Sequence, residues 1–509
     1  MNSQASRTNA AVIDLGFNSV KMVCYTVDRN GNFRPYRQDA FKVRLGEGLD
    51  QTGYLGEAQM KLTVGYLKTF RDIAQLESVG TVLPVATSAV REASNGDEFL
   101  REVRAGTRLS FRVLSERDEA LYSYAGAVGF APEPNVVLFD LGGGSLDIAC
   151  ASGYRIWKTT SLPLGSLRIS MEFEGDGGAF SKQSIKQMKE RIAGSLPKWL
   201  ASQTSRKATL VGVGGTVRAM ARYDQELNGY PFAKVQSYRI PYGSVNAMSK
   251  SLLKKSRREL EKVDAVGNRS DSIAAGALVV KMLMRHLGSR ELRVSSYGLR
   301  EGTLSMYLRN QKLFHSGRDP RAEVERFVTD SARRLHKASE GNQLGFEKVG
   351  LIGRREAALL AEAYLLVSRA QPSVNLRSYF LSLVEEDSSF THREQLKAAV
   401  VVIATRKGRM ADSLMEEFAD FLPDGAKQEV GRLSAVYSFL ETSERADVKV
   451  RASRHGRDLE IELTEPNGTA PRSLLAYQAE EMGDKLGLRV ALSFTQAPKE
   501  RLANGRAQA

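Results

Sequence analysis

The chain has 509 residues, 42% of them hydrophobic, and a formal net charge of +14 at neutral pH. This length is enough for three or four domains, and the hydrophobic fraction is ordinary for a folded globular protein. The five histidines are scattered and the chain has two cysteines, so no Cys/His cluster has the spacing of a zinc site, which argues against a zinc enzyme.

The positive charge bears on partners rather than on fold. Nucleic acid, an acidic membrane, polyphosphate and a basic surface kept only for solubility stay open, but no basic tail or aromatic-interleaved run favours a dedicated nucleic-acid site. We expect no membrane partner, because no run of about 18 apolar residues occurs, and no signal peptide, because residues 1–10 are polar. Each cysteine ends an apolar strand pattern, which is typical of buried thiols in a reducing compartment, so a cytoplasmic location is predicted.

Strand and helix patterns alternate through the first 310 residues, which predicts the α/β class. The elements expected first are a strand–turn–strand unit at 11–27, a strand or loop at 41–50, a helix at 56–77, a strand running into a helix at 81–93, and a similar unit at 111–130 whose helix is opened by Ser115. The next are a hairpin at 136–150, a strand at 154–160, a helix at 181–204, a strand entering a helix at 208–222, a helix at 270–287, and a strand, turn and helix at 291–308.

The pattern changes after this α/β part. A linker is expected at 310–320, and apolar residues at helical spacing predict an all-helical stretch at 321–441. A hairpin at 446–466, a helix at 472–486 and a strand at 488–494 predict a small α/β cap. We expect the residues from 497 onward to form a frayed tail.

One hairpin occurs twice in the chain. IDLGFNSVKMVC at 13–24 aligns with FDLGGGSLDIAC at 139–150, so that Asp14 matches Asp140 and Ser19 matches Ser145. A glycine-rich turn between buried strands exposes several N–H groups that can hold a phosphate, and the aspartate before each turn can reach Mg²⁺ or its waters. A single D-x-G turn is weak support, since it occurs in ordinary hairpins. Two copies in register predict two similar domains that present phosphate loops across a cleft.

This arrangement resembles the actin, sugar kinase and heat-shock chaperone superfamily, and within it the exopolyphosphatase/guanosine pentaphosphate phosphatase (Ppx/GppA) family. The resemblance covers about 11–305. It rests on the two hairpins and on the following stretches, in the expected order: VRLGEGL, ATSAVREASN, LSERDEALYSYAGAV, LPLGSLR, GVGGTVRAMA, RSDSIAAGA and YGLREGTL.

The resemblance implies a fold of duplicated actin-like (ribonuclease H-like) domains around a cleft, then an all-helical HD-like domain and a small α/β C-terminal domain. The expected limits are 1–130 for the first actin-like domain, with a final helix supplied from 300–310, then 131–310, 321–441 and 446–500. The HD-like domain is expected to lack the His-Asp pair, because Val367 and Ser368 align there and His392 has no metal partner near it in sequence.

The resemblance also implies hydrolysis of a terminal phosphoanhydride, with Glu119 as the base that orients or deprotonates water. The metal ligands implied for Mg²⁺, or alternatively Mn²⁺, are Asp14, Asp140 and Asp147. The phosphate-binding residues implied are Gly16, Asn18, Ser19, Arg91, Gly142, Gly143, Gly144, Ser145, Gly214, Gly215 and Thr216, of which the last three are expected to shape the cleft floor. Arg44 is a candidate to extend the phosphate path, while Arg300 and Glu301 are equally well interpreted as a structural ion pair.

The chain departs from the family pattern at several positions. Phe17 stands where the family has serine, Leu146 and Asp147 replace Thr-Glu, and Glu116 replaces a glycine near the presumed base. Asp147 is one methylene shorter than glutamate, so a direct contact made by the family residue is lost or bridged by water. These departures raise a question about turnover and about the length of the substrate.

Three functions stay open from the sequence. The first is an exopolyphosphatase that releases orthophosphate from inorganic polyphosphate, and the second is a guanosine pentaphosphate phosphatase on the same site. The third is a polyphosphate-binding regulatory protein with low turnover. A kinase is disfavoured, because only GVGGTVRA suggests an adenosine pocket. The family resemblance implies a homodimer. Basic residues that could line a substrate channel, or equally form a solvated face, are Lys254, Lys255, Arg257, Arg258, Arg406, Lys407 and Arg409.

Overall fold

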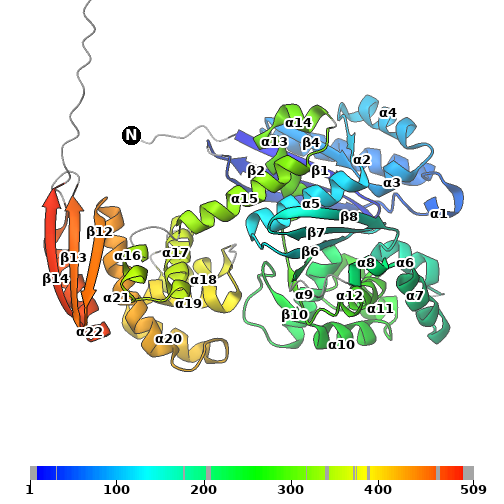
Figure 1. The fold of residues 1–509 in the computed structure, drawn as a ribbon. Helices are drawn as coiled ribbons and strands as arrows, with labels where there is room; N and C mark the ends of the chain where they lie inside the picture. Colours follow the sequence, from blue (N-terminus) through cyan, green and yellow to red (C-terminus); the bar gives the residue numbers. More distant parts are fainter. Residues whose placement is uncertain are drawn as a thin grey trace, which may run out of the picture. The chain divides into compact units, whose positions relative to one another are not determined.

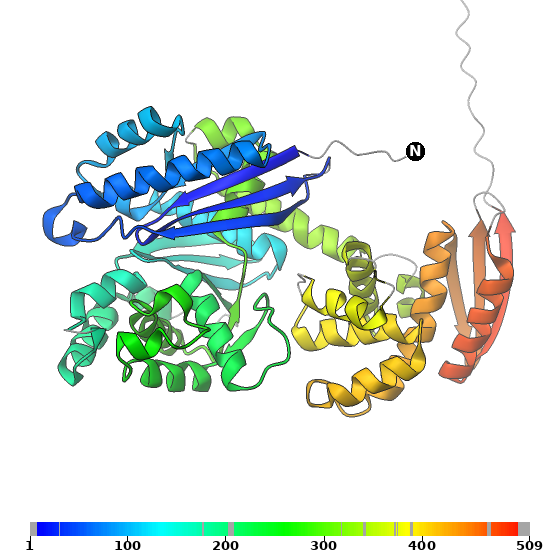
Figure 2. The same ribbon diagram turned by 180° about the vertical axis from the view of Figure 1, so that it is seen from behind.

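A computed structural model describes residues 8–29, 31–175, 178–201, 208–316, 318–338, 343–370, 373, 375–386, 390–465 and 470–496. The chain forms two compact units, Met1–Ala332 and Arg333–Ala509. The first unit contains two sheets with helices around them, and the second contains a group of helices and a small sheet (Figures 1 and 2).

The first lobe of the first unit, lobe I, is built on a five-stranded sheet of order β3-β2-β1-β4-β5. Strand β1 pairs antiparallel with β2 and parallel with β4. The strands are β1 (Thr8–Leu15), β2 (Ser19–Val27), β3 (Phe33–Lys42), β4 (Thr81–Ala86) and β5 (Arg112–Val113). The helices of this lobe are α1 (Leu49–Thr52), α2 (Glu57–Leu76), α3 (Ser88–Glu92), α4 (Gly96–Thr107) and α5 (Glu116–Phe130).

The second lobe, lobe II, is built on a six-stranded sheet of order β10-β11-β9-β6-β7-β8. Its strands are β6 (Val136–Leu141), β7 (Leu146–Ser152), β8 (Arg155–Leu162), β9 (Thr209–Val213), β10 (Arg239–Pro241) and β11 (Glu291–Val294). Its helices are α6 (Ser166–Phe173), α7 (Lys182–Ser195), α8 (Lys198–Ala201), α9 (Gly215–Leu227), α10 (Tyr242–Leu252), α11 (Arg257–Leu260) and α12 (Ile273–Leu287), with a 3-10 turn at Gly267–Arg269.

Two helices lie where the sheets of the two lobes meet. Apolar residues of α5 and α13 (Leu299–Arg309) share one core with strands from both sheets, including Val12 of β1 and Leu138 of β6. The helices approach closely because a Cβ on Gly302 would collide with the carbonyl of Tyr122, and one on Gly126 with the carbonyl of Gly298. This crossing fixes α5, whose first turn carries Glu119, in the middle of the first unit (Figure 1).

Helix α14 (Gln311–Ser316) follows, and α15 (Arg321–Ala338) begins in the first unit. The second unit contains α16 (Gln343–Lys348), α17 (Arg354–Arg369), α18 (Leu376–Glu385), α19 (His392–Ala404), α20 (Gly408–Glu417), a 3-10 turn at Ala419–Phe421, and α21 (Ala426–Arg445). Its three-stranded sheet has the order β12-β13-β14, with β12 (Lys449–His455), β13 (Asp458–Glu465), α22 (Arg472–Leu486) and β14 (Arg489–Gln496).

Most predicted elements are present, and three predictions need correction. The helix predicted at 181–204 breaks into α7 and α8 at Leu196–Pro197, because proline cannot continue the helical hydrogen bonding; its last part, 202–204, lies outside the described residues. The linker predicted at 310–320 contains α14, and the break between units falls after Ala332 instead. Strand β3 begins at Phe33, well before the predicted start at 41.

Some of the remaining sequence predictions are confirmed, and others are not tested by the structure. Ser115 does cap α5, since its hydroxyl accepts a hydrogen bond from the Asp118 N–H, and both cysteines are buried free thiols as expected. None of the helices in the described part of the chain is long and apolar enough to cross a membrane. The tail predicted from 497 lies outside the described residues, and the limits of the four predicted domains stay predictions.

The crossing of α5 and α13 gives a first testable prediction. Gly302→Ala forces a methyl group into the backbone of α5, so we expect unfolding to become easier by about 1–3 kcal/mol, the usual cost of overpacking. Denaturant unfolding measures this change. Gly65→Ala on α2 is the matched control: nothing lies within 4 Å of the added methyl, and alanine favours the helix, so unchanged or higher stability is expected. Equal effects of the two substitutions would contradict the close approach.

Candidate functional site

The two glycine turns have the same backbone geometry. In the first, the Gly16 N–H donates to the Ser19 carbonyl at 3.1 Å, and in the second the Gly142 N–H donates to the Ser145 carbonyl at 3.0 Å. The turns face each other across the gap between the lobes, since a Cβ on Gly143 would lie 3.0 Å from the Cβ of Asn18. The repeated hairpin of the sequence therefore forms two opposed turns.

Carbonyl groups of both turns accept hydrogen bonds from neighbouring segments of their own lobe. The Phe17 carbonyl accepts from the Gly46 N–H at 3.0 Å, and the Asn18 carbonyl accepts from the Arg44 N–H at 2.9 Å. In the second turn, the carbonyls of Gly142, Gly143 and Gly144 accept from backbone N–H groups of residues 165–168. Because a trans peptide places the following N–H opposite the carbonyl, the N–H groups that follow these carbonyls point away from the supporting segments, and the residues that carry them line the pocket. Such nests suit phosphate oxygens.

A pocket lies between the turns. The predicted site residues that line it are Asp14, Gly16, Asn18, Ser19, Glu119, Asp140, Gly142, Gly143, Gly144, Ser145, Gly214, Gly215 and Thr216. Gly214 has a φ of 108°, a conformation that strongly favours glycine, and it allows β9 to turn directly into α9 at the pocket wall. Arg91 and Asp147 do not line the pocket, but each binds a residue that does.

Glu119 is buried in the first turn of α5 and is held by Arg91. The Arg91 Nη1 group donates to Glu119 Oε2 at 2.8 Å and to the Leu114 carbonyl at 2.9 Å. The Nε and Nη2 atoms of Arg91 are buried without a hydrogen-bond partner, so they are donors available to an anion. Burial, together with repulsion from Asp147, raises the pKa of Glu119 well above its usual value, although Arg91 opposes this shift.

Two further carboxylates, one buried and one half-buried, lie opposite each other on neighbouring strands. Asp140 of β6 is the cross-strand partner of Asp147 of β7. The Ser123 hydroxyl donates to Asp140 at 2.6 Å, and the Ser145 hydroxyl donates to Asp147 at 2.7 Å. Burial raises the pKa of Asp140, and it raises the pKa of Asp147 to about 7 although serine hydrogen bonds oppose the shift.

These carboxylates fit a divalent cation that is shared with a phosphate. Asp147 Oδ1 is buried without a hydrogen-bond partner, and a cation beside Asp140 and Asp147 would relieve the cost of placing their charges together. Within the described ranges, no group of three or more His, Cys, Asp or Glu side chains is arranged to hold a metal by itself. This suits Mg²⁺, which commonly binds one or two carboxylates and completes its shell with water and phosphate oxygens. Asp14, on the facing lobe, lines the same pocket.

The pocket floor is cationic, which the sequence reasoning missed. Lys21 faces Asp14 across β1 and β2, at the position where the second hairpin has Asp147 facing Asp140. Burial lowers the pKa of Lys21 to about 8, against the effect of Asp14, and the guanidinium groups of Arg300, Arg269 and Arg218 lower it further. The replacement of Asp147 by Lys21 in the aligned hairpins was the available signal in the sequence.

These three arginines come from different elements, and Arg269 is the one of them that lines the pocket. Arg269 lies against Gly215, where any side chain would collide with its guanidinium group. Burial lowers the pKa of Arg218 to about 10, with Arg300 and Arg269 adding to the shift. Arg300 is buried, and its Nη1 has no hydrogen-bond partner. Glu301 accepts from the Tyr25 hydroxyl and the Gly298 N–H, so it anchors the start of α13.

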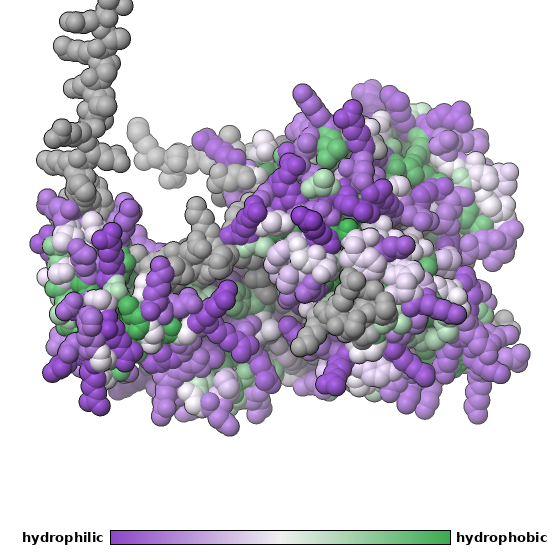
Figure 3. Space-filling view, viewed as in Figure 1, coloured by the Kyte–Doolittle hydropathy of each residue, from purple (hydrophilic) through white to green (hydrophobic). Residues whose placement is uncertain are grey.

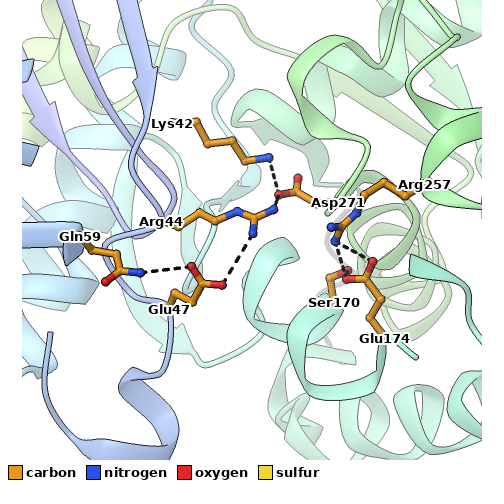
Figure 4. A network of polar contacts seen from close by, with 8 residues as sticks. All are labelled: Lys42, Arg44, Glu47, Gln59, Ser170, Glu174, Arg257 and Asp271. Atoms are coloured by element: carbon orange, nitrogen blue, oxygen red, sulfur yellow. Dashed lines mark hydrogen bonds and ion pairs between the residues drawn. The ribbon is translucent and has the colours of Figure 1, made fainter. Parts of the chain in front are cut away.

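Ion pairs join the lobes at the edge of the pocket (Figure 4). Asp271 of lobe II binds Lys42 Nζ at 2.5 Å and Arg44 Nη2 at 2.9 Å, both from lobe I. Arg44, a candidate to extend the phosphate path, is thus already paired, and it also lies 3.7 Å from Glu47. Nearby, Arg257 binds Glu174, the residue that follows α6, at 2.7 Å. Glu116 is exposed and does not line the pocket.

Comparisons with known proteins show the family of this chain. Residues 25–311 match the model of the Ppx/GppA phosphatase family. The chain belongs to the Ppx/GppA family. The match ends before the second compact unit begins, so that unit is not part of the family assignment.

Relatives share a modest identity with this family member. Exopolyphosphatase 1 of Mycobacterium tuberculosis is 25% identical over 300 residues, which cover 58% of this chain and 86% of the relative. A bifunctional 3-dehydroquinate synthase/phosphatase of Fusobacterium nucleatum is 25% identical over 297 residues, 56% of this chain but only 44% of that protein. The crystal structure of an exopolyphosphatase from Cytophaga hutchinsonii aligns with a TM-score of 0.55 at 23% identity, covering 59% of this chain and 98% of the other, which supports the shared fold.

The half-buried side chain of Lys21 gives a prediction about pH. With Glu119→Gln as background, we expect tripolyphosphate to bind more weakly as the pH rises from 7 to 9, because Lys21, with a pKa of about 8, loses its charge in this range. Lys21→Arg keeps its charge and should flatten the profile between these two values. Isothermal titration calorimetry measures both proteins. If the two profiles run parallel, Lys21 does not contribute its charge to anion binding.

Proposed function

We propose that this Ppx/GppA protein is an Mg²⁺-dependent exopolyphosphatase that releases orthophosphate from the ends of inorganic polyphosphate. The observation that carries the proposal is the position of Glu119, which lies in the wall of a pocket formed by two opposed N–H nests and is oriented by Arg91. This arrangement can hold neighbouring phosphates of a chain and place a carboxylate beside a terminal one. The names of the exopolyphosphatase relatives support the choice of substrate.

In the proposed reaction, the nests formed by the turns of Gly16–Ser19 and Gly142–Ser145 bind phosphate oxygens and orient the chain end. Glu119 accepts a proton from water while the water oxygen attacks the terminal phosphorus, and the bridging P–O bond breaks to give orthophosphate and a chain shorter by one phosphate. A raised pKa makes Glu119 a stronger base than a free carboxylate, and Arg91 fixes its orientation. Bound Mg²⁺ would supply charge neutralisation at the phosphate oxygens, held by Asp140, Asp147 and Asp14.

The cationic floor favours polyphosphate over the alternatives. In kinase relatives, the segment around Gly214–Thr216 would border adenosine, but here the Arg269 guanidinium lies against Gly215 and Lys21 lines the same pocket. A floor of this kind favours further phosphates over an apolar ring. Guanosine pentaphosphate remains the second candidate, because its 5′-phosphates fit the same nests.

A regulatory protein with low turnover is less well supported by the geometry. Glu116, one reason for that hypothesis, is exposed and outside the pocket lining, so its charge is screened by solvent. Asp147, the shortened residue, still lies opposite Asp140 with one oxygen lacking a hydrogen-bond partner. A homodimer and a cytoplasmic location stay predictions from the sequence.

Glu119→Gln tests the hydrolase directly. We expect release of orthophosphate from long polyphosphate with Mg²⁺ to fall by about 10²–10⁴-fold, the usual contribution of a general base. Binding of polyphosphate should persist, since the nests are untouched. Glu116→Gln, in the same helical turn but exposed, is the matched control and should keep nearly full activity. If the wild-type protein binds both substrates tightly but releases no orthophosphate from either, with Mg²⁺ or with Mn²⁺, the proposal that it is an enzyme is wrong.

Salt dependence separates the two substrates. Long polyphosphate displaces many counterions when it binds, so its affinity should fall steeply between about 50 and 200 mM salt, whereas guanosine pentaphosphate should show a shallower slope. Fluorescence anisotropy of the Glu119→Gln protein measures both without turnover. Equal slopes, together with higher kcat/KM for guanosine pentaphosphate, would favour the nucleotide phosphatase instead.

A further inference from the structure

Phe17 has a place in the structure that no serine could fill. Its side chain is 2% exposed, although it belongs to a phosphate-binding turn. One side of the ring lies against Gly46 of lobe I, where a Cβ would collide with the ring, and a Cβ on Gly144 of the opposite turn would lie 2.5 Å from Phe17 Cδ2. The ring therefore occupies a slot that spans both lobes and that exists because two glycines line it.

Arg168 of lobe II covers this ring and crosses to lobe I. Its guanidinium carbon lies 4.9 Å from the centroid of Phe17. Its Nη1 donates to the Gly144 carbonyl at 2.9 Å, its Nη2 binds Glu92 at 2.6 Å, and its Nε lies 3.0 Å from Asp50. Gly144 belongs to the second phosphate turn, whereas Glu92 and Asp50 belong to helices of lobe I. With its side chain only 4% exposed, this arginine ties the second turn to the opposite lobe in a site shielded from solvent.

The apolar contacts beside this pair also cross between the lobes. Leu167, next to Arg168 on α6, is 1% exposed and belongs to the same core cluster as Phe17, Leu45 and Val90 of lobe I, and Met171 packs against that cluster. Helix α6 thus contributes both a buried arginine and an apolar edge to the facing lobe.

The ion pair between Arg168 and Glu92 is connected through helix α3 to Glu119, the presumed base. Glu92, which binds Arg168, follows Arg91 on the short helix α3, and Arg91 orients Glu119. The position of α3 therefore depends on a residue of lobe II that also holds the Gly144 carbonyl. If the lobes separated, Arg168 would keep the Gly144 carbonyl but lose Glu92, so the second phosphate turn would no longer be tied to the helix that carries Arg91.

We propose that Phe17 and Arg168 are positioning residues that hold the two lobes closed before substrate binds, and so keep both phosphate nests and Glu119 in register. The proposed closed arrangement differs from the family pattern in one respect, since an aromatic ring fills the slot at a position where that pattern has serine. Its kinetic consequence rests on the proposed function, but the closed arrangement itself does not.

The first test measures the separation of the lobes in the full-length protein. Spin labels at Lys61→Cys on α2 and Lys186→Cys on α7 sit on side chains that are 73% and 78% exposed, while Cys24 and Cys150 are buried. Without ligand, pulsed electron paramagnetic resonance should give one narrow distribution of the distance between the two labels in the otherwise wild-type protein. Phe17→Ser should add a population at longer distance, and tripolyphosphate with Mg²⁺ should return it to the short one. Phe17→Leu, which refills most of the slot, should stay narrow.

Two variants separate closure from general destabilisation. Phe70→Leu removes a buried ring of lobe I that packs against Phe41, and it should leave the distance unchanged whatever it does to thermal unfolding. Arg168→Lys retains the charge but not the forked contacts, and it should open the lobes even if Phe17→Ser fails to fold. An unchanged distribution in both Phe17→Ser and Arg168→Lys, or two populations in the wild-type protein without ligand, would overturn the proposal.

The kinetic test asks whether closure positions the site. If the closed fraction falls to about one tenth in Phe17→Ser, KM for tripolyphosphate should rise roughly tenfold, while kcat stays near the wild-type value because saturating substrate restores closure. Phe17→Leu should rescue KM. A fall in kcat with unchanged KM would overturn the positioning role. If no variant, wild type included, hydrolyses the substrate, the proposed function fails, while the distance measurement still decides whether the lobes are held closed.

Discussion

The orientation of a few peptide groups is the constraint on which the site depends. The carbonyls of Phe17 and Asn18 are bound by residues 43–46, and those of Gly142, Gly143 and Gly144 are bound by residues 165–168. Each turn is therefore braced from behind by its own lobe, with its N–H groups directed toward the pocket. If one supporting segment moved away, the carbonyls would be free to rotate inward and would repel a phosphate rather than bind it.

The charges on the two sides of the pocket differ because the two copies of the hairpin carry different residues at one matching position. The second copy places Asp147 opposite Asp140, whereas the first places Lys21 opposite Asp14. Burial disfavours the charged form of both residues, since it raises the pKa of Asp147 to about 7 and lowers that of Lys21 to about 8. A carboxylate side and a cationic side face one pocket, which suits a ligand that combines phosphate with a divalent cation.

The sequence was sufficient for the parts of the site that depend on local geometry. A glycine-rich turn after an aspartate forms a similar nest wherever it occurs, so the alignment of 13–24 with 139–150 predicted both turns. It could not predict that Arg91 would bind Glu119, that Arg269 would lie against Gly215, or that Phe17 would enter a slot beside Gly144, because these contacts join residues distant in the chain. The break at Pro197 and the early start of β3 were missed because apolar spacing locates elements better than it locates their ends.

The departure at Phe17 shows why a motif mismatch has to be judged in three dimensions. From the sequence, phenylalanine in place of serine means the loss of one hydroxyl from a phosphate loop. In the structure the ring is buried between the lobes under Arg168, and the turn that carries it still directs its N–H groups to the pocket. The substitution therefore places a contact between the lobes where the family pattern has a hydroxyl. If this packing holds the lobes closed as proposed, part of the ordering that a substrate would otherwise have to drive is already present in the folded chain.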